Sequence, residues 1–300
     1  MNQFFKTKLF YFLVASICIF VQSCNNVDSG ANGDKEITEA TVDSNKTGVI
    51  NVGGELFSIP SPLQTVMLIK KSGAKYMQNE MNNTANIANY TSKNQKALNL
   101  GVYGADLGYS TAFNDNQSAV KSLNAIEQLS KELDITGAFN KDLIKRLGNN
   151  ANNQDSMLVI SSVFYRAADT YLKDNKRYDV GAMILAGGWV EGLYFTCLSA
   201  NEGNLPAKQR LGEQKVALQS LISLMNAQEK SPELETILTH LNSMNETYNQ
   251  LESTYTFQRP ETNEEKKLTT IKSTTTMKIS DQQVIEITNK LKILRTSIIG

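Results

Sequence analysis

Apolar residues recur every three or four positions along most of this chain, a spacing that places them on one face of an α-helix. The pattern is clearest in residues 116–133, where the apolar stripe consists of Val120, Leu123, Ile126, Leu129 and Leu133. Further helices are predicted over about residues 62–73, 136–147, 155–173, 179–200, 206–225, 232–253 and 280–298, and residues 78–90 and 92–114 continue in the same helical style. The sequence therefore predicts an all-α domain, a multi-helix bundle of about eight or nine helices.

One segment breaks the helical pattern. Residues 254–277 contain Pro260 and the threonine-rich run Thr269–Thr276, and β-branched residues are disfavoured in helices. We expect an extended crossover or a short hairpin here, before the last helix. The stretch Tyr178–Ala200 is the most apolar one after the N-terminal region, and we interpret it as a buried central helix of the bundle and not as a membrane span.

The N-terminal residues have the order of a targeting signal. Lys6 and Lys8 precede an apolar run, Leu9–Val21, of about 13 residues, whereas a membrane-spanning helix needs about 20. The run ends in Val21-Gln22-Ser23-Cys24, which resembles the lipobox of bacterial lipoproteins. The resemblance implies cleavage before Cys24 and attachment of acyl chains such as palmitate to that residue. Plain secretion and a membrane anchor are the alternatives.

This resemblance sets an expected organisation of the chain. Residues 1–23 are the signal peptide, residues 24–56 are a polar, flexible tether, and residues 57–300 are a single helical domain. The asparagine-rich composition also resembles exported proteins of the Bacteroidetes. Asn25 follows the cysteine, and few acids come after it, which by that resemblance implies an outer-membrane lipoprotein facing the periplasm, with surface exposure left open.

Composition excludes several classes of function. The chain has 30 basic and 30 acidic residues, so we expect no nucleic-acid partner. Once Cys18 is removed and Cys24 acylated, Cys197 is the only remaining cysteine, and we expect it to be buried. His240 is the only histidine, which leaves no cluster of histidine and cysteine ligands for a metal. We predict no metal site, no cofactor and no identifiable catalytic residue.

Two segments resemble each other and supply the candidate site. Each has glycines four residues apart, an acid between them and aromatic residues nearby. The first contributes Tyr103, Gly104, Asp106, Gly108 and Tyr109. The second contributes Gly188, Trp189, Glu191, Gly192 and Tyr194. Because glycine costs about 1 kcal/mol relative to alanine inside a helix, we expect these glycines to serve a purpose.

Two interpretations of the glycines remain open. Close contact between two helices is the simpler one, with the acids paired to a cation such as Arg166 or Arg177. A ligand pocket lined by the aromatic residues is the other. Separately, Asp155-Ser156-Met157 resembles the O-glycosylation motif of Bacteroidetes exported proteins, which implies modification of Ser156.

These observations favour a non-enzymatic envelope lipoprotein whose helical domain binds a small molecule or a protein partner. A structural or assembly role without a ligand is the alternative. An enzyme that uses Asp106 and Glu191 as a pair of acid–base groups is the third possibility.

Overall fold

The computed structural model describes residues 49–52, 55–58, 62–138, 170–171, 173–264 and 267–300. The signal segment, Cys24, Ser156 and Arg166 lie outside the described residues, as does most of the expected tether. The described helical domain falls within one compact unit, Val42–Gly300.

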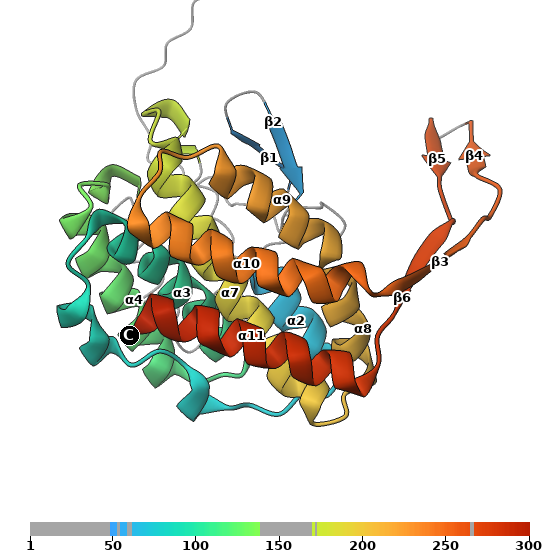
Figure 1. The fold of residues 1–300 in the computed structure, drawn as a ribbon, viewed down its shortest axis with the longest axis horizontal. Helices are drawn as coiled ribbons and strands as arrows, with labels where there is room; N and C mark the ends of the chain where they lie inside the picture. The colour runs from blue at the N-terminus through green and yellow to red at the C-terminus, as the bar shows by residue number, and fades with distance from the viewer. Residues whose placement is uncertain (1–48, 53–54, 59–61, 139–169, 172, 265–266) are drawn as a thin grey trace, which may run out of the picture. The chain divides into compact units, whose positions relative to one another are not determined.

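The described residues are predominantly helical, and the predicted all-α class is confirmed (Figure 1). The α-helices with described bounds are α2 (Pro62–Lys71), α3 (Lys93–Ala112), α4 (Asn116–Glu132), α7 (Tyr178–Asn201), α8 (Leu205–Glu213), α9 (Lys215–Asn226), α10 (Pro232–Asn249) and α11 (Asp281–Ile299). Short 3-10 turns are η1 (Gln78–Glu80), η2 (Thr84–Asn89) and η3 (Thr136–Ala138). The strands are β1 (Val49–Val52), β2 (Glu55–Ser58), β3 (Glu252–Thr256), β4 (Glu261–Asn263), β5 (Leu268–Thr270) and β6 (Thr274–Lys278).

Side-chain caps set the starts of several helices. Ser92 begins α3 and Ser280 begins α11, each in a reciprocal capping box with the glutamine three residues later. Ser231 caps α10 ahead of Pro232, as the Ser-Pro pair predicts. These caps satisfy backbone N–H groups that have no partner inside the helix.

Three sequence predictions of helix extent were wrong. The helix expected over residues 232–253 ends at Asn249, and β3 begins at Glu252. The helix expected from Pro206 through Met225 is two helices, because the chain turns at Gln214, which ends α8 and precedes α9. The helix expected over residues 78–90 is instead a pair of 3-10 turns, η1 and η2. Asn83 starts η2 by accepting a hydrogen bond from the Ala85 N–H, a local contact that competes with a continuous helix.

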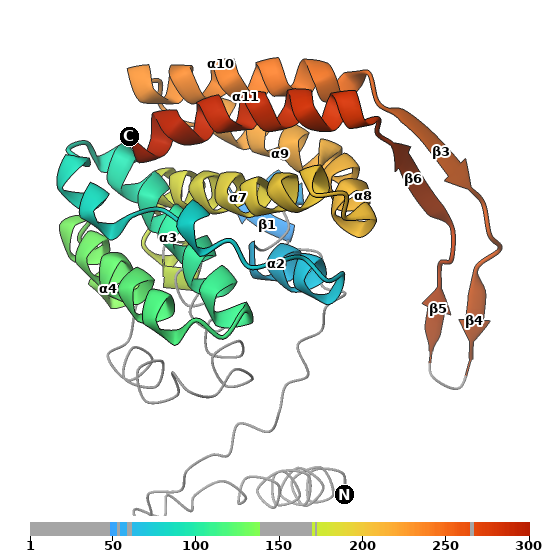
Figure 2. The same ribbon diagram turned by 90° about the horizontal axis from the view of Figure 1, so that it is seen from below.

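Helix α7 lies at the centre of the domain (Figure 2). It packs on α3 along one side and on α11, α8 and α2 along others, while α4 covers α3 and α10 covers α11. Among the described residues, α7 is the one helix long and apolar enough to cross a membrane by length and composition, yet most of its apolar stretch is buried inside the domain. A helix that is apolar on all sides is typical of the middle layer of a large core.

A β-ribbon connects α10 to α11, at the position where the sequence predicted a crossover or hairpin. We call Glu252–Lys278 the arm. Strand β3 pairs antiparallel with β6, and β4 pairs antiparallel with β5 further out (Figures 1 and 2). Only the base of the arm packs on the helices, through contact between β6 and α8.

A second hairpin lies at the other end of the described chain. Strands β1 and β2 pair antiparallel, with Val49 opposite Ser58 and Val52 opposite Glu55. This hairpin spans the expected boundary at residue 56 between the tether and the domain, and β2 contacts α9.

Candidate functional site

The two similar segments lie side by side on α3 and α7, the most extensively packed pair of helices. Their closest approach is at Gly101 and Gly187. A Cβ atom added to Gly101 would lie 1.9 Å from the Ile184 carbonyl oxygen, and one added to Gly187 would lie 1.9 Å from the Leu98 carbonyl oxygen. Glycine is therefore required at both positions, and this geometry matches the close-packing interpretation.

The sequence spacing emphasised other glycines of the same segments. It paired Gly104 with Gly108 and Gly188 with Gly192, whereas the tightest contacts involve Gly101 and Gly187. Gly188 does take part, because its backbone nitrogen lies 2.7 Å from the position of a Cβ on Gly101. The spacing identified the two helices correctly but not the residues at their contact.

The two acids of the candidate site meet in the interior. Asp106 on α3 and Glu191 on α7 are both fully buried, and they lie close enough for each carboxyl group to affect the pKa of the other. Arg295 of α11 binds Glu191 with two hydrogen bonds, from Nε to Oε2 at 2.5 Å and from Nη2 to Oε1 at 2.6 Å. Such bidentate, charge-assisted pairs are among the strongest hydrogen bonds in proteins.

Arg295 corrects the expected cation for this pair. The sequence analysis proposed Arg166 or Arg177, of which Arg166 lies outside the described residues. Arg177 instead lies near Asp179, with 4.0 Å between its Nε and Oδ1. A sequence signal for Arg295 exists, because it follows Leu291 by four residues and therefore lies on the apolar stripe of α11.

Burial decides the protonation of the acid pair. Desolvation and the neighbouring charge of Glu191 raise the pKa of Asp106 well above its usual range. Burial also raises the pKa of Glu191, against the opposing effect of Arg295. We therefore assign the proton of the pair to Asp106 and the negative charge to Glu191, which Arg295 neutralises.

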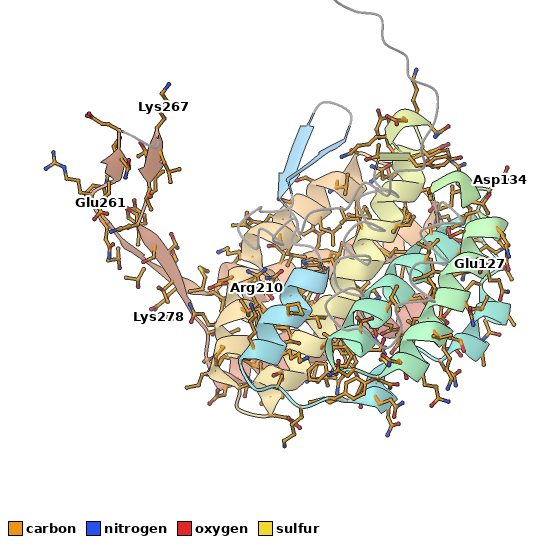
Figure 3. All side chains as sticks on the ribbon, turned by 180° about the vertical axis from the view of Figure 1, so that it is seen from behind. Glu127, Asp134, Arg210, Glu261, Lys267 and Lys278 are labelled. Carbon is orange, nitrogen blue, oxygen red and sulfur yellow. The ribbon has the colours of Figure 1, made fainter. Side chains whose placement is uncertain are left out.

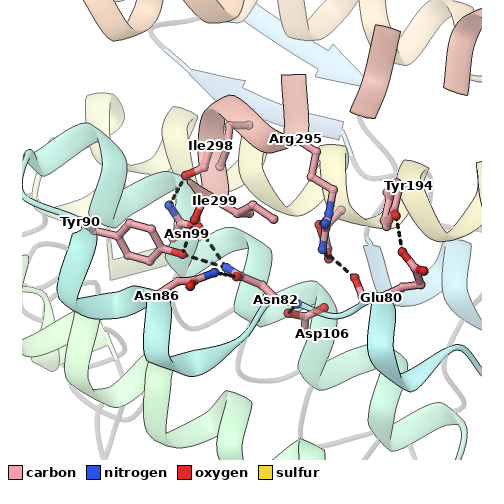
Figure 4. A network of polar contacts seen from close by, with 11 residues as sticks. Glu80, Asn82, Asn86, Tyr90, Asn99, Asp106, Tyr194, Arg295, Ile298 and Ile299 are labelled. Carbon is pink, nitrogen blue, oxygen red and sulfur yellow. Dashed lines mark hydrogen bonds and ion pairs between the residues drawn. The ribbon is translucent and has the colours of Figure 1, made fainter. Parts of the chain in front are cut away.

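A polar network that the sequence analysis missed connects this pair to the end of the chain (Figure 4). The Asn82 backbone N–H donates to Asp106 Oδ2 at 3.1 Å, and the Asn82 side-chain amide donates to Asn99 Oδ1 at 3.2 Å. Asn99 in turn donates to the Ile298 carbonyl at 2.7 Å. Arg295 also donates to the Glu80 carbonyl at 2.7 Å. The network thereby joins the η1–η2 segment and the C-terminal turn of α11 to the central helices.

The four aromatic residues expected to line a pocket are buried and occupied by other contacts. Tyr109 stacks on Phe195 with ring centroids 3.8 Å apart, and Trp189 donates from Nε1 to Gln214 Oε1 at 3.2 Å. The remaining two bond to the η1–η2 segment: Tyr103 donates to the Asn83 carbonyl at 2.9 Å, and Tyr194 donates to the Glu80 carboxylate. Stacking and hydrogen bonds to other described residues therefore occupy these four aromatic side chains.

A cavity outlined by described residues lies elsewhere. It has a volume of about 120 Å³ and is lined by residues of α3, α10 and α11, including Leu98, Ile237 and Ile298. Ligand pockets usually measure about 300–1,000 Å³, so this cavity is too small for most metabolites.

The remaining chemical candidates give no reactive site among the described residues. Cys197 is fully buried, and desolvation raises the pKa of its thiol to about 12, which keeps it protonated. His240 lies on α10 with intermediate exposure. No group of three or more histidine, cysteine, aspartate or glutamate side chains is placed to hold a metal ion in the described ranges.

The arm is the most exposed part of the described chain. Every described residue from Glu252 to Lys278 is exposed except Ser273 and Met277, which are intermediate (Figure 3). Large apolar side chains point into solvent, with Phe257 and Ile271 exposed by 69% and 73%. Among the described residues, no third strand pairs with either outer edge of this ribbon, because each sheet there has two strands.

No family model, curated protein or solved structure matches the chain. The buried acid pair and the exposed arm are the features of the described residues that bear on function.

Proposed function

We propose that this chain is a non-enzymatic, lipid-anchored protein of the bacterial envelope that binds a protein partner through its arm. Acylation at Cys24 supplies the anchor, and the tether holds the helical domain away from the outer membrane on the periplasmic side. The observation that carries the binding role is the exposed two-stranded ribbon with open edges. Such edges bind extended segments of other proteins by strand addition.

The buried acid pair supports a binding role over catalysis. Asp106 and Glu191 have no exposed surface, and Glu191 is already neutralised by Arg295. Acid–base catalysis needs the carboxyl groups within hydrogen-bond reach of a substrate. In the described residues these groups instead hold three helices together.

The β5–β6 edge of the arm is the better strand acceptor. The β3–β4 edge is interrupted by Pro260 and by the longer connection between its strands, whereas residues 268–278 contain no proline. The β5–β6 side carries Lys267, Lys272 and Lys278, and residues 267–278 contain no acid. The partner segment that fits this edge is therefore extended and acidic.

Site-specific photo-crosslinking in the native host tests this assignment. A photoreactive residue at Thr275, in the exposed centre of β6, should crosslink a protein partner, and the same group at Val120 on α4 is the matched control. Exchanging Lys272 and Glu261, as Lys272→Glu with Glu261→Lys, keeps their ion pair of 2.6 Å but removes a positive charge from the edge. The crosslink should weaken in that variant.

Two results would contradict the proposal. One is a crosslink at Thr275 that is unchanged by the charge exchange, and the other is the same partner captured equally at Val120. The anchor is tested separately by labelling with an alkyne fatty acid. The label should be present in the wild-type chain and lost in Cys24→Ser, with release of the protein from the membrane fraction.

A further inference from the structure

Helix α11, an outer helix of the domain (Figure 1), presents two large apolar side chains to solvent. Ile285 and Ile293 are exposed by 46% and 58%, although isoleucine is a weaker helix former than the charged residues usual on such a face. They lie four residues before and four residues after Asn289, which is also exposed, so the three residues share one stripe of the helix. The stripe that packs into the core lies on the opposite side of α11 and consists of Val284, Ile287, Leu291, Leu294 and Ile298.

The exposed apolar surface continues onto the start of α8. Asn201, the last residue of α7, donates to Thr288 Oγ1 at 2.8 Å. Lys208 of α8 forms an ion pair of 2.5 Å with Asp281. These two contacts hold the connection between α7 and α8 alongside the first half of α11. Leu205 lies between them in sequence and is exposed by 73%, so it adds to the apolar surface beside that half of the helix.

Charge is distributed unevenly along the same helix. Apart from the buried Arg295, the first half of α11 carries Asp281 and Glu286, and the second half carries Lys290 and Lys292. Two such helices placed antiparallel bring the acidic half of each beside the basic half of the other, whereas a parallel pair brings like charges together. The dipoles of two antiparallel helices also oppose each other favourably.

The exposed stripe is symmetric about Asn289. If two α11 helices pair antiparallel around a twofold axis beside this residue, each Ile285 lies level with Ile293 of the second copy. The isoleucines then bury one another on either side of a central pair of asparagine side chains, whose amide groups both donate and accept hydrogen bonds. A single polar pair within such a seam fixes the register of two helices. A second copy therefore fits this face, because the same residues supply both sides of the contact.

We propose that two copies of this chain associate through their α11 helices, antiparallel and centred on Asn289. Burial of the exposed isoleucines is the driving force, and it is gained only in the dimer. Glu286 of each copy then lies within one helical turn of Lys290 of the other. A contact between two helices is small for a stable dimer, so we expect weak association. The surface is separate from the arm, and dimerisation is therefore a role beyond partner binding.

Disulfide crosslinking of the full chain tests the centre of the contact. Asn289→Cys lies at the proposed axis and should give a linked dimer on a denaturing, non-reducing gel after mild oxidation. Val120→Cys on α4 is the matched control, because Val120 is 40% exposed and lies on another helix. The wild-type chain reports any background from its own cysteines, of which Cys197 is buried. A dimer that forms no faster with Asn289→Cys than with Val120→Cys would overturn the proposal.

Mixed variants distinguish antiparallel from parallel pairing. Ile285→Cys and Ile293→Cys, carried on chains of different tag length, should crosslink to each other. Ile293→Cys alone should crosslink poorly, because in the antiparallel pair its two copies are offset by eight residues, about 12 Å along the helix. Efficient crosslinking of Ile293→Cys with itself would show parallel pairing and would contradict the assigned arrangement.

The dissociation constant of the dimer measures the contribution of the isoleucines. Ile285→Ser/Ile293→Ser should raise this constant by about tenfold or more in analytical ultracentrifugation of the full chain in detergent, and Val120→Ser should leave it unchanged. Both isoleucines are exposed, so the double variant should keep the wild-type unfolding midpoint in urea, which shows that the loss is not one of folding. A monomeric wild type, or a constant that the double variant does not change, would refute dimerisation through this face.

These results are distinguishable from a failure of partner binding. The crosslink at Thr275 does not involve α11, so its loss with an intact dimer would reject the binding role of the arm alone. Capture of a different protein at Asn289 in the native host, without a dimer, would reject dimerisation and leave the role of the arm unaffected.

Discussion

Replacing Arg295 with methionine should cost more stability than any surface substitution in this chain. Methionine keeps the aliphatic stem of the arginine side chain but lacks the guanidinium, whose carbon lies 4.2 Å from the ring centroid of Tyr194. The variant loses two hydrogen bonds to Glu191 and one to the Glu80 carbonyl. Glu191 then remains fully buried beside Asp106 with no cation.

The expected loss follows from that geometry. Removing one partner of a buried ion pair typically costs about 3–5 kcal/mol in the free energy of unfolding. For a domain of about 250 residues this corresponds to a fall in Tm of about 6–20 °C. Urea unfolding followed by circular dichroism at pH 7 measures the difference. Lys131→Met is the matched control, because its ion pair with Glu127 is exposed and worth about 0.5 kcal/mol or less.

The pH dependence of the Arg295→Met variant sharpens the test. Without the guanidinium, the folded-state pKa of Glu191 rises further above its unfolded value. A folded state that binds more protons loses stability as pH increases, so the deficit should be larger at pH 8 than at pH 5. The double variant Glu191→Gln/Arg295→Met removes the buried charge and should be more stable than Arg295→Met alone. A deficit below about 1 kcal/mol, or a double variant that is no better, would refute the reasoning.

Three further predictions test other parts of the structure. Asp106→Asn should leave stability nearly unchanged at acidic pH and should make the protein more stable than the wild type at high pH. The reason is that the folded-state pKa of Asp106 is raised, so the wild type loses stability as the pH rises above the pKa of this residue in the unfolded chain. Unfolding curves measured over a pH series test this, and two proteins whose stabilities change in parallel with pH would contradict it. Gly187→Ala should lower the free energy of unfolding by more than about 3 kcal/mol in urea, because the added Cβ would overlap the Leu98 carbonyl. Gly203→Ala is the control: no atom lies near its Cβ position, so only the positive φ of this residue opposes the change, at a cost of about 1–2 kcal/mol. Cys197, with its thiol pKa raised to about 12, should resist alkylation at pH 8 in the folded protein and react after unfolding, as mass spectrometry would show.

The helical class and many element positions were predictable because they depend on local patterns. The apolar stripe of residues 116–133 corresponds to α4, and the Ser231-Pro232 cap marks the start of α10. The threonine-rich run and Pro260 correctly indicated extended structure before α11. The break at Gln214 was missed because the apolar spacing continues through it, and the geometry of that turn depends on packing against other helices.

The candidate site was predictable in part. The shared spacing of glycine, acid and aromatic residues identified α3 and α7 as neighbours and selected Asp106 and Glu191. It did not identify Arg295, which is more than 100 residues away from Glu191 in sequence. A charged residue on an apolar stripe is a local signal, but its partner is set by which helices pack together.

The sequence by itself determined the helical periodicity, the helix caps, the extended arm and the glycines that permit close helix contact, because each follows from interactions within a few residues. Tertiary structure alone decided that Gly101 and Gly187 are the contact points, that Asp106 and Glu191 meet, and that Arg295 neutralises them. The physical reason is that burial and charge pairing depend on which helix faces lie against one another. The same burial that raises the pKa of Asp106 makes the acid pair a structural element of the core, whereas every residue of β3 in the arm is exposed.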